Sequence, residues 1–254
     1  MWVERWLVPT GTGFKMALKR RYLKFIYSLA VSYFVSGTKA EEFVLDFVKA
    51  DRSTVFKALQ ANLDLSRVDS LNIDIQIPND HLVFLYLGRF IKLKGILHLL
   101  EAFSIINKKF NKITLILVGD GELKSYYENY AVNIGLSNLL FLPAVDDNDN
   151  SLKAGFYNIC DAFILPSTIE NNQAEGWGLT VGEAMSLGKP VIVTDAVGCS
   201  ADMVKNGING YIVKHGCSES LAEALSKMIN NKENLCIMGN KSREIFEEKI
   251  SYEK

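Results

Sequence analysis

From about residue 82 onward, short apolar runs alternate with longer amphipathic segments. Short continuous apolar runs indicate strands buried on both faces, whereas apolar residues three and four positions apart indicate helices. The pattern predicts strands at residues 82–88, 113–119, 139–145, 162–166, 190–196 and 210–214. It predicts helices between them at residues 96–110, 122–136, 151–160 and 180–188, and a closing helix at 218–231. This order predicts an α/β fold, a Rossmann-like doubly wound parallel sheet that binds ligands at the carboxyl ends of its strands.

The first 80 residues follow a different pattern. They predict one basic helix, a strand at residues 33–37 and a helix at residues 38–47. These elements are too few to close a second complete sheet domain. We therefore expect residues 1–80 to form a partial first domain with its linking segment, and residues 81–254 to form the ligand-binding domain.

The composition is that of a globular protein with a sizeable core, since 48% of the residues are hydrophobic and 22% are charged. Lys and Arg number 28 and Asp and Glu number 29, so the net charge of -1 creates no long-range attraction for nucleic acid. The four cysteines are widely spaced, which indicates reduced thiols rather than a disulfide framework. The first residues lack the layout of a signal peptide, and the apolar stretch at residues 25–35 is too short to span a bilayer. These features favour a cytoplasmic protein.

A basic and aromatic segment lies near the amino terminus. Residues 15–25 carry Lys19, Arg20, Arg21 and Lys24 among aromatic side chains. Such a segment can rest on an anionic membrane surface, which makes residues 15–25 a candidate peripheral membrane contact. The alternative, which the pattern favours, is a solvated helix face whose aromatic residues lie in the core.

The stretch EGWGLTVGEAM follows a predicted strand and carries Glu175 and Glu183, with seven residues between them. Gly176 and Gly178 let the backbone approach a ligand closely. A helix that begins near Leu179 presents free N–H groups and the positive end of its dipole, which together form a site for a phosphate. Glu183, about one turn into that helix, can accept hydrogen bonds from two ribose hydroxyls, and Glu175 can reach a sugar. The alternative is an ordinary helix with a glycine-rich entry and a solvated carboxylate.

A second cluster follows the first strand of the predicted sheet. The stretch GRFIKLKG places Arg89 just after that strand and Lys94 at the start of the next helix. Both cations are therefore expected at the sheet edge that holds the helix terminus near Leu179. Arg89 can bind two phosphate oxygens with its fork of N–H groups, and Lys94 adds a point charge. A solvated basic loop is the favoured interpretation for Lys92.

Other groups of polar residues point to ordinary structural roles. His81, His98 and His215 lack the spacing of metal ligands. The acidic run at residues 146–149 is best explained as a cap for the helix that follows it. We therefore predict no metal site.

The two clusters together resemble the nucleotide-sugar-binding half of glycosyltransferase family 4, a retaining family with the GT-B architecture of two facing Rossmann-like domains. The resemblance covers roughly residues 82–250 and consists of five motifs in the family's order. They are G-R-F-x-K-x-K-G at residues 88–95, VGDGE at 118–122, LPS at 165–167, the run from Glu175 to Glu183 with EAMSLGKPVI, and GINGYIV at 207–213.

The resemblance implies a role for each residue of the two clusters. Arg89 and Lys94 would neutralise the diphosphate of the donor, and Glu183 would hold its ribose. Glu175 would contact the donor sugar and serve as the catalytic carboxylate. The backbone around the glycine-rich turn would line the diphosphate and the sugar, through Gly176, Trp177, Gly178, Leu179 and Thr180. No cofactor and no metal ion is implied, and a UDP-linked sugar is the expected donor.

The same resemblance sets the expected function and its alternatives. It implies a retaining, metal-independent transfer of a hexose from a nucleotide-diphosphate sugar to a glycan, lipid-linked or small-molecule acceptor. Residues 1–80 look like the end of the family's acceptor domain with the interdomain link, so most of that domain is expected to be missing. The main alternative is a non-catalytic donor-binding module, or a truncated chain, that needs a separate acceptor-binding partner. A GT-B epimerase or phosphorylase ranks lowest, because it would need catalytic histidines or a cofactor lysine.

Overall fold

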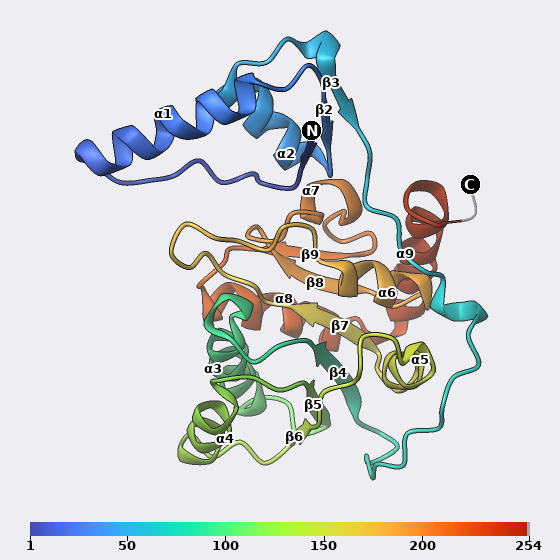
Figure 1. The fold of residues 1–254 in the computed structure, drawn as a ribbon. Helices are drawn as coiled ribbons and strands as arrows, with labels where there is room; N and C mark the ends of the chain where they lie inside the picture. The colour runs from blue at the N-terminus through green and yellow to red at the C-terminus, as the bar shows by residue number, and fades with distance from the viewer. Residues whose placement is uncertain (253–254) are drawn as a thin grey trace.

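The computed structural model describes residues 1–252 and contains two parallel sheets of different size (Figure 1). The larger sheet has the order β6-β5-β4-β7-β8-β9, and every neighbouring pair is parallel. Its strands are β4 (Leu82–Leu87), β5 (Ile113–Val118), β6 (Leu139–Leu142), β7 (Ala162–Leu165), β8 (Val191–Thr194) and β9 (Gly210–Val213). Numbered within this sheet, the order is 3-2-1-4-5-6, the order of a Rossmann fold, which confirms the predicted Rossmann-like doubly wound parallel sheet.

Helices cover both faces of the larger sheet (Figure 1). Helix α3 (Ile96–Asn107) packs against α8 (Ser218–Asn230) and contacts α4 (Lys124–Asn133) on one face. Helix α6 (Leu179–Ser186) packs against α9 (Leu235–Lys249) on the other face, which also carries α5 (Asn150–Ile159). The predicted helices thus form within a few residues of their expected positions. Helix α9 and the single turn α7 (Ser200–Met203) were not predicted.

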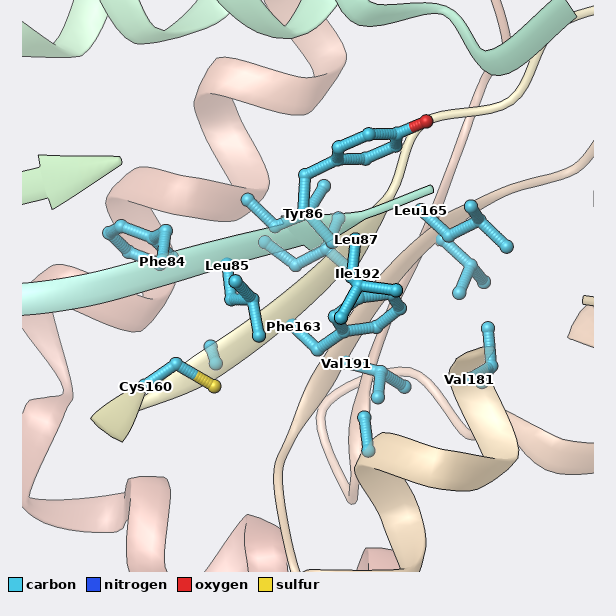
Figure 2. Packing of buried hydrophobic residues seen from close by; sticks show 14 of the residues in the cluster. Phe84, Leu85, Tyr86, Leu87, Cys160, Phe163, Leu165, Val181, Val191 and Ile192 are labelled. Carbon is cyan, nitrogen blue, oxygen red and sulfur yellow. The ribbon is translucent and has the colours of Figure 1, made fainter. Parts of the chain in front are cut away.

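Burial in the core explains why these apolar segments form the strands of the larger sheet. Side chains of β4, β5, β7 and β8 are buried almost without interruption, as expected for strands with helices on both faces. Figure 2 shows Leu85 and Leu87 of β4 on the face of the sheet that also carries Phe163 of β7, and Phe84 and Tyr86 of β4 on the other face. Burying each of these side chains stabilises the fold by about 1.5–3 kcal/mol.

A small amino-terminal unit has its own sheet and its own apolar core. Its parallel strands are β1 (Trp2–Val3), β2 (Tyr33–Val35) and β3 (Val55–Lys57), in that order. Helix α1 (Phe14–Ser28), helix α2 (Thr38–Glu42) and the π-helical segment η1 (Phe43–Val48) accompany them. The sequence predicted β2 and the α2–η1 segment, but it missed β1 and β3. β1 and β3 are as short as β2 or shorter, and they lack the glycine turn and the following helix that mark the end of β2 in the sequence.

The segment between the two units is anchored on the larger domain. Asp64 accepts hydrogen bonds from both terminal nitrogens of Arg243 on α9, at 2.5 and 2.7 Å. Arg243 also donates to the carbonyl of Ser186 at the end of α6. The backbone N–H of Asn62 donates to the carbonyl of Ile250, just after α9. Helix α9 therefore connects the linking segment to α6.

Direct contacts also join the two units. Asp202 of α7 accepts hydrogen bonds from the Thr38 amide and hydroxyl at the start of α2, at 2.8 and 2.7 Å. Lys39 donates to the carbonyls of Asp195 and Val197, which follow β8. Burial lowers the pKa of Lys39, although nearby carboxylates oppose that effect. The start of α2 thus sits directly on the carboxyl-end loops of the larger sheet.

Candidate functional site

The two candidate clusters lie where the strand order of the larger sheet reverses. Strands β4 and β7 are neighbours, but the chain leaves β4 toward β5 and leaves β7 toward β8, on opposite sides of this point. The loops after the two strands therefore diverge and leave a crevice at their carboxyl ends. Arg89 and Lys94 follow β4, whereas Glu175 and Glu183 follow β7.

The loop after β4 is held by close backbone packing. Gly95 has a φ of 68°, and a Cβ at this position would lie 2.0 Å from the carbonyl oxygen of Pro166. The Thr168 amide donates to the carbonyl of Leu93 at 2.8 Å. The G-R-F-x-K-x-K-G and LPS motifs are therefore in contact. Only glycine allows the approach that brings Lys94 beside the β7 loop.

The VGDGE motif supports the same loop from its other side. A Cβ on Gly119, which has a φ of 157°, would lie 2.0 Å from the carbonyl oxygen of Gly88. The Phe90 amide donates to the carbonyl of Asp120 at 2.7 Å. In this structure the motif thus packs against the turn that carries Arg89, which gives it a structural role.

Arg89 is the exposed cation of the site. Its carbonyl accepts a hydrogen bond from the hydroxyl of Tyr86 at 2.8 Å, which fixes the turn. Burial raises the pKa of Tyr86 well above its ordinary value, so this hydroxyl keeps its proton. Within residues 1–252, no carboxylate forms an ion pair with the Arg89 guanidinium. Its fork of donors is therefore available to an anion.

Lys94 and Glu175 form an ion pair across the crevice. The Lys94 Nζ lies 2.5 Å from the Glu175 Oε2, and the two side chains expose only 13% and 17% of their area. The Ser167 hydroxyl of the LPS motif donates to the same carboxylate oxygen at 3.1 Å. The indole of Trp6, from the amino-terminal unit, donates to the Glu175 carbonyl at 3.0 Å. Three separate segments thus fix the position of Glu175.

Glu183 belongs to a second polar cluster on the other side of α6. Its Oε2 accepts a hydrogen bond from the Tyr157 hydroxyl at 2.8 Å, and its Oε1 lies 3.5 Å from the Lys153 Nζ. The buried Lys153 also donates to the carbonyl of Asp147, in the loop after β6, at 2.7 Å. Burial and the Glu183 carboxylate raise the pKa of Tyr157 well above its ordinary value. Tyr157 therefore remains a donor and orients the carboxylate.

The glycine-rich turn leads into α6 as expected. Gly178 is the N-cap residue with φ 98° and ψ 62°, and no side chain caps the helix. The first-turn N–H groups of Leu179 and Thr180 therefore have no side-chain acceptor among residues 1–252. The Trp177 side chain is buried, and its ring lies against the position of Gly37 in the amino-terminal unit. Gly176 lines a cavity of about 250 Å³ between residues 4–7 and the loop before α6.

Sequence reasoning missed three residues that shape the site: Ser167, Lys153 and Tyr157. Lys153 and Tyr157 lie four positions apart on α5, so they share one helix face. That spacing was the available signal, since a lysine and a tyrosine on an otherwise apolar face suggest a buried acidic partner. Nothing local in the sequence identifies Ser167 as a partner of Glu175.

The remaining polar groups have structural roles. Asp149 caps α5 by accepting the Leu152 amide at 2.9 Å, and Asp146 accepts the Asn148 amide at 2.8 Å. The capping role predicted for the acidic run is therefore confirmed for Asp149. Burial raises the pKa of the Cys160 thiol to about 12. In the described part of the chain, no group of three or more His, Cys, Asp or Glu side chains is arranged to hold a metal ion.

Comparisons with known proteins concern the family and the fold of this chain. The family model described as "Glycosyl transferases group 1" matches residues 69–245. CapM of Staphylococcus aureus, a capsular polysaccharide biosynthesis glycosyltransferase, is 32% identical over 178 residues, which are 69% of this chain and 44% of that protein. Sucrose-phosphate synthase of Thermosynechococcus elongatus has the same fold, with a TM-score of 0.76 at 22% identity over 93% of this chain and 58% of that chain.

A further solved structure, Anabaena Alr3699/HepE in complex with UDP and glucose, matches with a TM-score of 0.68 at 19% identity, over 94% of this chain and 65% of that chain. The structural likenesses show the GT-B fold of these glycosyltransferases. The chain spans about half the length of the curated relatives it matches. The family model covers more than half of this chain, and the protein therefore belongs to the glycosyl transferases group 1 family.

Proposed function

We propose that this chain binds a nucleotide-diphosphate sugar in the crevice at the carboxyl ends of β4 and β7. The observation that carries the proposal is the contact between Lys94 and Glu175, which joins the loop after β4, where Arg89 also lies, to the loop that leads into the uncapped start of α6. Two cations and a helix N-terminus can attract a diphosphate, and the Glu175 carboxylate beside Lys94 can accept sugar hydroxyls.

The reaction we propose is transfer of the hexose to an acceptor hydroxyl. The bond between the anomeric carbon and the diphosphate breaks, and negative charge grows on the leaving diphosphate. The acceptor oxygen bonds to the same carbon, and the proton of the acceptor hydroxyl passes to the leaving diphosphate. In this proposal Arg89, the α6 N–H groups and Lys94, once the diphosphate has drawn it from Glu175, stabilise that charge, so the protein itself supplies the electrostatic assistance. The transfer we propose is therefore metal-independent.

Glu175 and Glu183 take different parts in this proposal. Glu175 lies next to the lysine that would hold the diphosphate, so its charge can stabilise an oxocarbenium-like transition state on the sugar ring. Glu183 is held by Tyr157 and Lys153 about one turn into α6, which suits a carboxylate that accepts both ribose hydroxyls. Retention of the anomeric configuration is proposed from the family resemblance of the motifs.

A UDP-linked sugar is the proposed donor, and the complex of HepE with UDP and glucose supports this choice. The proposed acceptor is a glycan, a lipid-linked or a small-molecule acceptor, and the name of CapM, which refers to capsular polysaccharide biosynthesis, supports the glycan. The second candidate function is a donor-binding module that acts with a separate acceptor-binding chain. Donor binding without turnover by the isolated chain would distinguish it from the complete transferase.

The test of donor binding is a calorimetric titration with UDP and UDP-glucose of the native chain and two variants. Arg89→Ala should weaken binding roughly ten- to a hundredfold, which corresponds to about 1.5–3 kcal/mol for a charge-assisted hydrogen bond. Lys92→Ala is the matched control, because Lys92 lies in the same loop but pairs with Glu170 in solvent. Equal affinities of the Arg89 variant and the native chain would contradict the proposed site.

A further inference from the structure

Helix α1 carries an exposed apolar stripe. Its members are Phe14, Leu18, Tyr22, Phe25 and the C-cap residue Leu29, and each exposes between 57% and 83% of its area. At 100° per residue, these five positions fall within an arc of about 80°. The interpretation that the aromatic residues of this segment lie in the core is therefore wrong for Phe14, Tyr22 and Phe25. They form one continuous band that faces away from the protein.

Basic residues flank the stripe on both sides. The same helical geometry places Lys15 and Lys19 beyond one edge of the stripe, and Arg21 and Lys24 beyond the other. Helix α1 contains no Asp or Glu. The fifth basic residue, Arg20, faces the protein and donates to the carbonyls of Pro9 and Gly11. The exposed face is thus apolar along its centre and cationic along both edges.

The opposite face of α1 fixes the direction of the stripe. Leu23 and Tyr27 pack against the core of the amino-terminal unit, and the Tyr27 carbonyl accepts the Tyr33 hydroxyl at 2.7 Å. The Tyr27 and Phe43 rings meet edge to face, with centroids 5.4 Å apart. Figure 1 shows α1 projecting sideways from the small sheet, clear of the helices around the larger sheet. Because α1 packs on the amino-terminal unit through this inner face, the apolar stripe on its opposite face is exposed.

We infer that α1 lies in the interface of an anionic lipid membrane. Its 15 residues have a length of about 22 Å, which suits a helix in the membrane plane rather than across the bilayer. In residues 1–252, no helix combines the length and the apolar character needed to cross a membrane. The aromatic and aliphatic stripe fits the boundary between headgroups and acyl chains, and both rows of cations fit the phosphates above it. A protein partner would have to supply acidic groups along both edges of one apolar groove, whereas a lipid surface supplies both at once.

The inference concerns a surface away from the donor crevice and extends the proposed function. It can be tested by sedimenting the full chain with vesicles of phosphatidylcholine alone and with vesicles of equal parts phosphatidylcholine and phosphatidylglycerol. Binding should require phosphatidylglycerol and should weaken as the salt concentration rises. The double variant Phe14→Ser/Phe25→Ser should reduce the partition coefficient by at least about tenfold. Lys19→Gln should reduce it about fivefold at low salt.

The matched control is Tyr126→Ser/Val132→Ser on α4. These side chains expose 51% and 76% of their areas, so the control removes a similar apolar surface from another helix. It should leave vesicle binding unchanged. UDP titrations of each variant keep the two proposals separate, because substitutions in α1 should not alter donor affinity.

Two results would overturn the inference. One is the absence of vesicle binding by the native chain at low salt. The other is self-association of the native chain in analytical ultracentrifugation, if the variant Phe14→Ser/Phe25→Ser abolishes that self-association. A second copy of the chain would then cover the stripe.

Discussion

The Lys94–Glu175 pair makes a prediction that is specific to this site. In the structure Glu175 holds the lysine that a donor diphosphate would need, at 2.5 Å. A diphosphate must therefore compete with this carboxylate for Lys94. Replacing Glu175 by Gln keeps the hydrogen bond from Ser167 and the size of the side chain but removes the competing charge. UDP should consequently bind more tightly to Glu175→Gln than to the native chain.

The burial of the pair sets the magnitude of this effect. Exposed ion pairs contribute about 0–1 kcal/mol, and breaking a fully buried pair costs about 3–5 kcal/mol. Exposures of 13% and 17% place the pair between these limits, at about 2 kcal/mol. The Glu175→Gln variant should therefore bind UDP up to about thirtyfold more tightly. The gain should be smaller for UDP-glucose, because the same substitution weakens contact with the sugar.

Isothermal titration calorimetry measures both affinities directly. The matched control is Glu170→Gln, which removes a carboxylate from the same loop but breaks only the exposed pair with Lys92 at 3.0 Å. Its UDP affinity should equal that of the native chain. Weaker or unchanged UDP binding by Glu175→Gln would refute the idea that Glu175 and the diphosphate share Lys94.

Three further predictions concern the supports of the site. Arg243 and the Ser66 hydroxyl and amide outweigh the effect of burial and lower the pKa of Asp64 to about 2 from its ordinary value of 3.8. Because this pKa is lower in the folded state, the ionised Asp64 stabilises the fold by about 2 kcal/mol above pH 4, and this stabilisation disappears as the pH falls toward 2. Asp64→Asn should therefore lower the free energy of unfolding, measured with urea at pH 7, by about the same amount. Tyr157→Phe should weaken UDP binding by about 1 kcal/mol by releasing Glu183, without a comparable effect on binding of inorganic pyrophosphate. Gly95→Ala should lower the melting temperature and abolish UDP binding, because the methyl group meets a backbone carbonyl at 2.0 Å, and normal affinity would show that the loop can move away.

The larger sheet could be predicted because its strands are long and apolar. The runs at β4 and β5 cover six residues each, and helix α3 after β4 has a clear apolar face. Strands β1 and β3 could not be predicted, since their short runs lack the glycine turn and the following helix that mark β2, and the pairing of Trp2 with Phe34 depends on distant segments. The exposure of Phe14 and Phe25 was missed for a related reason. The pattern shows that a helix has two apolar faces but does not show which face the fold covers.

The candidate site could be predicted as a location but not as a set of contacts. Arg89, Lys94 and Glu175 were assigned to one sheet edge because parallel strands bring their carboxyl ends together. The pairing of Lys94 with Glu175 joins residues that are 81 positions apart, and no local pattern encodes it. Lys153 was overlooked because its partner Glu183 belongs to another helix. Long-range pairing is thus the information that only the fold supplies.

The most direct test of the central claim is the calorimetric titration of the native chain with UDP, GDP, UDP-glucose and GDP-mannose. We predict saturable binding of UDP and UDP-glucose that Arg89→Ala weakens at least about tenfold and Lys92→Ala leaves unchanged. Absence of binding to all four nucleotides, or binding that Arg89→Ala does not affect, would contradict a donor site at the carboxyl ends of β4 and β7.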